Sequence, residues 1–131
     1  MIRLSRVSAI ALAAFLTSCG AHSPTGPQPG TLQVKLQDPN SGDGAIMFTL
    51  SGPTAVTNLA AGGGDTLWSA NSGSTVNRVL LTGAIGNGTI LRFDVPDVGA
   101  VSEYIVSVNS AASSADYSLR SVVNYSAFVS R

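Results

Sequence analysis

Apolar and polar residues alternate with a period of two over much of the chain beyond Gly30. In residues 31–37, leucine or valine at positions 32, 34 and 36 is separated by polar residues, and residues 89–95 and 104–108 repeat the alternation. Successive side chains on a strand point to opposite faces of a sheet. Each of these segments therefore predicts a strand with one apolar face and one face in water.

Residues 45–50 are apolar at nearly every position, which predicts a central strand covered on both faces. Further strands are predicted at residues 55–60, 67–70, 76–82 and 123–129, separated by glycine, asparagine and serine clusters such as residues 71–74. We expect residues 76–82 and 89–95 to pair across the connection 83–88. Residues 97–103 and 111–116 fit either one helical turn or a loop.

The predicted fold class is an all-β, antiparallel β-sandwich. No segment beyond the N-terminus carries the 3.6-residue period of an amphipathic helix, and eight or nine short strands at intervals of about 8 to 14 residues are typical of a sandwich. A closed barrel fits the same number of strands. About 100 residues form one hydrophobic core, so we expect one domain over residues 31–131.

The N-terminus has the pattern of a secretion leader. Arg3 and Arg6 precede an apolar run at residues 7–16. This run of about ten residues is well short of the roughly 20 that a helix needs to cross a bilayer. Residues 1–18 are therefore predicted to be a removable leader and not a permanent membrane span.

Cys19, the single cysteine, ends the sequence Leu-Thr-Ser-Cys directly after that apolar run. This segment resembles the lipobox of bacterial lipoproteins. The resemblance implies cleavage before Cys19 and acyl chains on its thiol and its new amino group, which would anchor the chain to a membrane of the cell envelope. Gly20 stands where an aspartate often signals retention in the inner membrane, and this favours the outer membrane. The alternative is an ordinary secretion leader with an accidental cysteine.

Residues 19–30 are predicted to form a flexible tether between the acylated cysteine and the domain, because residues 21–30 hold three prolines, two glycines and no large apolar side chain. His22, the only histidine, lies in this tether and is expected to be solvated. Seven basic and seven acidic residues balance in the whole chain. No basic cluster indicates a nucleic-acid partner, and an acylated Cys19 leaves no disulfide, so stability is expected to come from packing.

The sequence predicts no catalytic site and no cofactor. A Ser-His-Asp triad needs a histidine base beside the nucleophile, and the sole histidine lies in the tether. Asp94, Asp97 and Glu103 are close enough in sequence to be considered as a pair of glycosidase carboxylates. We expect Asp94 to face outward on a strand and Asp97 to bond to the backbone of a turn, so we do not predict that the chain is an enzyme.

Residues 38–44 raise the question of calcium, because oxygen ligands at alternate positions suit a hard cation. The EF-hand register fails, since Gly42 would be the fifth residue, Asp43 would replace the required glycine, and Thr49 would replace the bidentate glutamate. Asp-Gly is a strong turn dipeptide. We therefore expect a hairpin turn here and no metal site.

Trp68, the only tryptophan, is expected to plug one end of the core. In the alternative interpretation it is an exposed platform for a sugar ring, joined by Tyr104 or Tyr117, because aromatic rings contribute much of the energy at binding surfaces. Trp68, Tyr104 and Tyr117 are thus the candidate ligand-binding residues.

Two segments resemble cohesin-like domains. Residues 44–51 are similar to the second-strand region of that family, and residues 88–95 to a later strand in which glycine and a small polar residue lead into alternating apolar positions. The order of segments is similar over residues 31–131. The resemblance implies a nine-stranded jelly-roll sandwich and a role in protein contact or surface assembly. Dockerin binding does not follow, because the binding-face residues have no match here. A glycan-binding module is the alternative function.

We predict that the mature protein begins at an acylated Cys19. Mass spectrometry of the N-terminal peptide is expected to show loss of residues 1–18 and the added mass of acyl chains, because peptidase and acylation both act at this cysteine in the proteins it resembles. An unmodified Cys19, or cleavage at another position, would contradict the lipobox interpretation.

Overall fold

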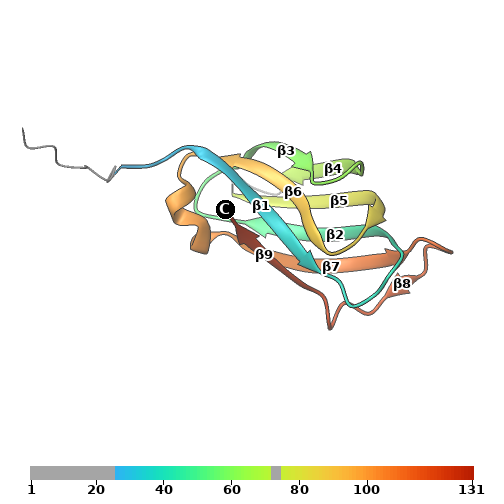
Figure 1. Cartoon of the computed structure of the whole chain (residues 1–131). Helices are drawn as coiled ribbons and strands as arrows, with labels where there is room; N and C mark the ends of the chain where they lie inside the picture. The colour runs from blue at the N-terminus through green and yellow to red at the C-terminus, as the bar shows by residue number, and fades with distance from the viewer. Residues whose placement is uncertain (1–25, 72–74) are drawn as a thin grey trace, which may run out of the picture.

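The computed structural model describes residues 26–71 and 75–131, and these fold as two antiparallel β-sheets packed face to face (Figure 1). The predicted β-sandwich is confirmed, and the two sheets are separate, so the chain is not a closed barrel. The leader, Cys19, His22 and most of the turn predicted at residues 71–74 lie outside the described residues.

Nine strands and one 3₁₀ helix make up the described part of the chain. The four-stranded sheet has, in spatial order, β3 (Thr57–Ala61), β6 (Gly88–Val95), β1 (Gly30–Gln37) and β9 (Ser126–Ser130). The five-stranded sheet has, in spatial order, β4 (Thr66–Asn71), β5 (Val76–Ile85), β2 (Asp43–Ser51), β7 (Ile105–Ser113) and β8 (Leu119–Arg120). The helix η1 (Val98–Glu103) lies between β6 and β7 in the chain.

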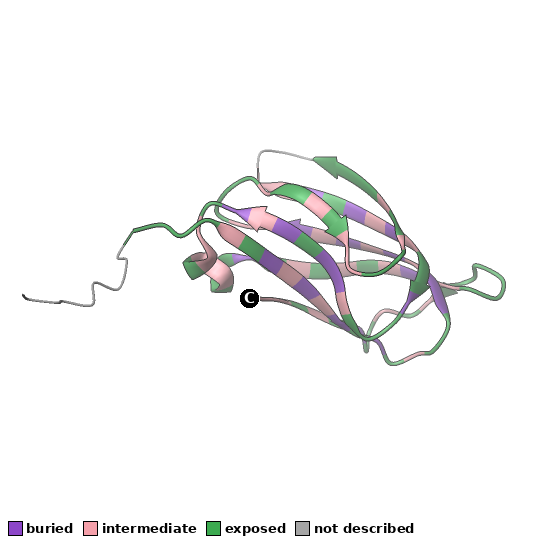
Figure 2. Ribbon diagram, turned by 45° about the horizontal axis from the view of Figure 1, so that its top comes forward, coloured by how far each residue is buried: buried purple, intermediate pink, exposed green. Residues whose placement is uncertain are grey.

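The core lies between the sheets and follows from the period-two pattern. Buried and more exposed residues alternate along the central strands (Figure 2). The largest fully buried apolar side chains are Phe48, Phe93, Leu32, Leu36, Ile46, Leu50, Leu81 and Leu91. Removing such surface from water is the dominant stabilising term in a domain of this size.

The expectation that β2 is covered on both faces is wrong. β2 is central within its sheet, but Ala45, Met47 and Thr49 on its outer face are only half-buried. A continuous apolar run is therefore not enough to predict that a strand is buried on both faces. The structure shows instead that the outer face of this sheet is itself partly apolar.

The expected pairing of residues 76–82 with residues 89–95 is also wrong, because β5 and β6 belong to different sheets. β5 continues through Gly83, whose φ of +143° suits glycine, to Ile85, and the chain then crosses the sandwich. β5 pairs with β4 and β2, and β6 pairs with β1 and β3. A glycine-rich connection thus joins two sheets here and does not close a hairpin.

The two segments that fit either one helical turn or a loop have different outcomes. Residues 98–103 form η1, and the Asp97 side chain accepts a hydrogen bond from the Gly99 N–H as its N-cap. Residues 111–113 instead extend β7, and a turn then leads to β8, a two-residue strand that the sequence pattern did not predict. The last strand starts at Ser126 and not at Val123.

Both chain ends of the described domain lie at one end of the sandwich, which we call the tether end. Gly30 pairs with Val95 there, beside η1, and Gln33 bonds to the carbonyl of Arg131. The opposite end, which we call the loop end, carries the connections at residues 38–42, 86–87, 114–118 and 121–125.

The last part of the predicted tether is held by the domain. The Gln28 N–H donates to the Asp97 carboxylate, and the Gln28 carbonyl accepts from the Val98 N–H.

We predict that Gly62→Ala destabilises the fold and that Gly64→Ala does not. A Cβ at Gly62 would lie 2.2 Å from the carbonyl oxygen of Thr89, a backbone atom that cannot move aside, whereas a Cβ at Gly64 meets nothing within 4 Å. Overpacking of this kind costs about 1–3 kcal/mol. Urea unfolding of both variants measures the difference. Equal stabilities would contradict the close approach of Gly62 to the backbone of Thr89.

Candidate functional site

The outer face of the four-stranded sheet carries polar side chains that bond to one another, together with the exposed ring of Phe128. Asp94 accepts hydrogen bonds from Thr31 Oγ1 at 2.6 Å and from Asn58 Nδ2 at 2.9 Å, and Thr89 Oγ1 donates to Gln33 Oε1 at 2.7 Å. The hydrogen bonds from Thr31 and Asn58 hold the pKa of Asp94 below its usual value. This is the expected composition of a sheet face in water.

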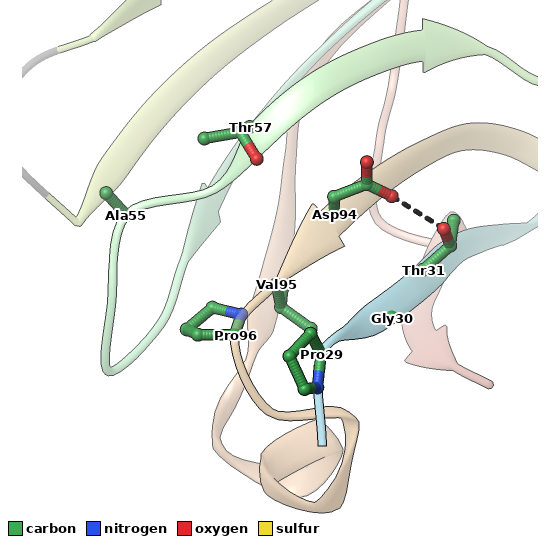
Figure 3. A pocket seen from close by; sticks show the side chains of 8 residues that line it. All are labelled: Pro29, Gly30, Thr31, Ala55, Thr57, Asp94, Val95 and Pro96. Carbon is green, nitrogen blue, oxygen red and sulfur yellow. Dashed lines mark hydrogen bonds between the residues drawn. The ribbon is translucent and has the colours of Figure 1, made fainter. Parts of the chain in front are cut away.

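A shallow groove of about 730 Å³ opens at the tether end of this sheet (Figure 3). Its walls include Pro29, Pro96 and Val95, and its charged group is Asp94, which is bonded to Thr31. Asp94 and Asp97 are therefore engaged in hydrogen bonds that fix local structure. The sequence predicted the backbone hydrogen bond of Asp97 and the outward position of Asp94, but not the side-chain hydrogen bonds of Asp94.

The outer face of the five-stranded sheet is different, because it carries apolar side chains and little charge. The strand registers align Trp68 with Leu80, Leu80 with Met47, and Met47 with Ser110, in one row across four strands. The outward side chains include Thr66, Trp68 and Ala70 of β4, Arg78, Leu80 and Thr82 of β5, Ala45, Met47 and Thr49 of β2, Ile105, Ser107, Ser110 and Ala112 of β7, and Leu119 of β8. We call this surface the Trp68 face, and Arg78 is the only charged residue in the set.

Trp68 is 61% exposed, so the expectation that it plugs one end of the core is wrong. The reason is its position in the alternation of β4. Leu67, the neighbouring residue, packs against the buried core, and Trp68 must then point to the opposite face. The alternative interpretation, an exposed aromatic ring, agrees with its position.

Tyr104 and Tyr117 do not join Trp68. Tyr104 is 5% exposed, its ring centroid lies 5.8 Å from that of Phe93, and its hydroxyl is hydrogen-bonded to Thr54. Tyr104 is therefore a core residue and not a surface ligand-binding residue. Tyr117 is 70% exposed but lies in the turn before β8, at the edge of the sheet opposite β4.

A cavity of about 280 Å³ adjoins Trp68 on this face. Its walls include Met47, Leu80, Ser69 and Arg78. An aromatic ring, two aliphatic side chains and one guanidinium group suit a ligand that is largely apolar or a sugar with hydroxyl acceptors.

A second cluster of functional groups lies inside the loop end and was not predicted. A β-bulge between Asp43 and Ala45 interrupts both pairings of β2, and Asp43 is 1% exposed. The Tyr125 hydroxyl donates a hydrogen bond to Asp43 Oδ2. Arg120 of β8 places Nε 2.6 Å from Asp43 Oδ1, a close ion pair. The buried carboxylate is thus paired, which a buried charge requires.

Asp38 lies beside this pair and is 8% exposed. Its N–H donates to Asn87 Oδ1, and its Oδ1 accepts from the Asn40 N–H. Its Oδ2 is buried without a hydrogen-bond partner. Burial raises the pKa of Asp38, and the neighbouring Asp43 carboxylate raises it further.

The cluster ties the loops at residues 38–42 and 121–125 to the strand β8. Asn40 Nδ2 donates to the Tyr125 hydroxyl, and Arg120 Nη2 donates to the Ser41 carbonyl. Burial, followed by the hydrogen bond to Asp43, raises the pKa of Tyr125 to about 12. The hydroxyl therefore stays protonated and keeps its role as donor at neutral pH. These contacts fix the loop at residues 38–42 against β8 and the start of β9.

The hairpin turn expected at residues 38–44 is wrong in topology, because this loop links β1 of one sheet to β2 of the other. Its two carboxylates, which raised the question of calcium, are those of the buried cluster, and Arg120 is the cation beside Asp43. Among residues 26–71 and 75–131, no group of three or more histidine, cysteine, aspartate or glutamate side chains could hold a metal ion.

In comparisons with known proteins, no family model, no curated protein and no solved structure matches this chain. In the part of the chain that the structure describes, no helix is both long enough and apolar enough to span a bilayer.

We predict that Asp38→Asn changes the pH dependence of stability. The folded-state pKa of Asp38 is raised above 3.8, so between 3.8 and the raised value the folded chain binds more protons than the unfolded chain. The contribution of Asp38 to stability therefore falls as pH rises through that interval. Asparagine keeps the acceptor for Asn40 and cannot ionise. Urea unfolding at several pH values is expected to show that the free energy of unfolding of the variant rises relative to that of the parent as pH rises.

Asp94→Asn is the matched control for this experiment. The pKa of Asp94 is lowered by Thr31 and Asn58, so its contribution is present above 3.8 and is lost as pH falls through the lowered value. The free energy of unfolding of Asp94→Asn should therefore fall relative to that of the parent as pH rises. Parallel pH profiles for the parent and Asp38→Asn would contradict the interpretation of the buried carboxylate.

Proposed function

We propose that this protein is a non-enzymatic lipoprotein of the bacterial cell envelope, anchored by acyl chains on Cys19, whose β-sandwich binds a protein partner through the Trp68 face. The lipobox-like segment supports the anchor, and the absence of an aspartate at Gly20 favours the outer membrane. The resemblance of residues 31–131 to cohesin-like domains supports a role in protein contact.

The observation that carries the binding role is the exposure of Trp68 in a row with Leu80 and Met47. This apolar strip runs from the edge strand β4 to the central strand β2 and loses water when a partner covers it, and tryptophan is among the residues that contribute most at interfaces. The outer face of the other sheet carries hydrogen-bonded polar side chains, so an apolar strip is not a general feature of the outer faces of this domain.

The position of the tether agrees with this proposal. Gln28 and Gly30 enter the domain at the tether end, beside η1 and the four-stranded sheet. The Trp68 face belongs to the other sheet. An anchored domain therefore presents this face without the described part of the tether crossing it.

A glycan-binding module is the second candidate function. The cavity beside Trp68 favours it, because the Arg78 guanidinium supplies hydrogen-bond donors next to an aromatic ring. A sugar ring stacked on the indole would use those donors for its hydroxyl groups.

We predict that Trp68→Ala weakens binding at least tenfold, or about 1.4 kcal/mol, because the indole is a large apolar group that is 61% exposed on the proposed contact surface. The measurement is capture of partners from detergent-solubilised envelope by the full chain, with a glycan array in parallel. Phe128→Ala is the control, since Phe128 is a 45% exposed aromatic on the other sheet. Protein capture lost only in Trp68→Ala supports the first function, and sugar binding lost only in that variant supports the second. Binding that both variants retain would contradict the Trp68 face as the site.

A further inference from the structure

The two sheets end in four edge strands, and three of them are protected against pairing with another chain. β3 is interrupted by a bulge between Thr57 and Ala60, and Asn58 has a φ of +51°. β8 has only two residues, one of which is the inward-pointing Arg120. β9 packs against β7 and η1. Bulges, short length, inward charges and covering elements are the devices by which proteins block edge pairing.

β4 has none of these devices. Its six residues pair with β5 without a register shift, and they include no charged residue, no proline and no bulge. β4 has β5 on one side and, among the described residues, no strand on the other. A regular, uncharged edge strand is a template for a further strand.

Self-pairing of β4 is geometrically restricted. In an edge strand, alternate residues turn their backbone N–H and C=O groups outward. Two antiparallel copies can exchange hydrogen bonds only when such residues oppose each other, so opposed positions are both even or both odd. Side chains of opposed residues then lie on the same face. Trp68 can therefore oppose Trp68 of a second copy, with Thr66 opposite Ala70.

We propose that β4 pairs antiparallel with β4 of a second copy of this chain, about a two-fold axis at Trp68, so that the two five-stranded sheets join into one sheet with a continuous Trp68 face. This inference goes beyond the proposed function, because it needs no partner other than the chain itself.

A second copy fits this edge for two reasons. The strand carries no charge, so pairing it with itself opposes no like charges, and Arg78 lies one strand further in. The axis also brings two exposed indole rings together on one face, and cross-strand aromatic pairs stabilise antiparallel strands.

The proposed anchors are compatible with this dimer. The two-fold axis turns the tether ends of the copies in opposite directions along the strands. The nine peptide links from Cys19 to Gln28 can span at most about 30 Å. A ten-residue strand such as β5 is roughly 33 Å long, so each tether can reach about as far as the domain extends along its strands. Both copies can therefore stay anchored to one membrane when their strands lie along its plane.

The first test is analytical ultracentrifugation of the full chain in detergent over a range of concentrations. The parent is expected to form a reversible dimer. Trp68→Lys should weaken it at least tenfold, because two ammonium groups would oppose each other at the axis. Phe128→Lys, on the edge strand β9, should leave it unchanged. Circular dichroism confirms that each variant is folded. A parent that stays monomeric, or equal effects of the two variants, would overturn the proposal.

Leu80→Lys separates this inference from the proposed function. Leu80 lies on the Trp68 face but one strand in from the edge. The variant should lose the binding partner and keep the dimer. Loss of the dimer in Leu80→Lys would show that the copies associate through the face, which would overturn edge pairing while leaving the face as a binding surface.

Cysteine cross-linking tests the register. Oxidation of the Trp68→Cys chain is expected to give a disulfide-linked dimer, since position 68 opposes itself, while Phe128→Cys should give none above the background of the parent, which has Cys19. A dimer that forms through Ser69→Cys but not through Trp68→Cys would overturn the Trp68-centred pairing.

Discussion

The burial of one face of each sheet against the other is the constraint on which this structure depends. The described domain contains no cysteine, so no disulfide restricts its unfolded state, and the apolar layer between the sheets has to supply the stability. Because side chains alternate along a strand, this requirement decides which residues face outward as well as inward. The position of Leu67 in the core and the exposure of Trp68 are two consequences of one choice of register.

The core requirement leaves the outer faces unconstrained, and the two sheets use that freedom differently. The four-stranded sheet carries on its outer face a set of polar side chains that bond to one another, and one exposed aromatic ring, Phe128. The five-stranded sheet places Met47, Leu80 and Trp68 in line on its outer face. Folding requires none of these three side chains to be apolar at their outward positions. Their selection is therefore better explained by contact with another molecule than by stability, and this reasoning underlies the proposed function.

Alternation in the sequence was enough to predict the fold class and most strands, and the position of Asp97 after Pro96 predicted its bond to the backbone of a turn. It could not predict which strands pair. The connection from β5 to β6 has the glycine content of a hairpin, yet it crosses between sheets, and only the long-range packing of β2 between β5 and β7 determines this. The position of Trp68 was missed for a related reason, since β4 is too short for its own pattern to show which face is inner.

The buried cluster at the loop end shows the same limit for charged residues. Asp43 and Arg120 are far apart in sequence, and nothing local marks either as buried. A bulge at Gly44 and the two-residue length of β8 bring them together, and both features depend on the completed sandwich. Arg120 serves two purposes there, because it pairs the buried carboxylate and, by pointing inward, makes β8 unsuitable for a further strand. The opposite edge, β4, has no such residue. One sheet thus has an edge protected by an inward charge and an edge without one, and this asymmetry is the reason that the proposed self-association is assigned to β4.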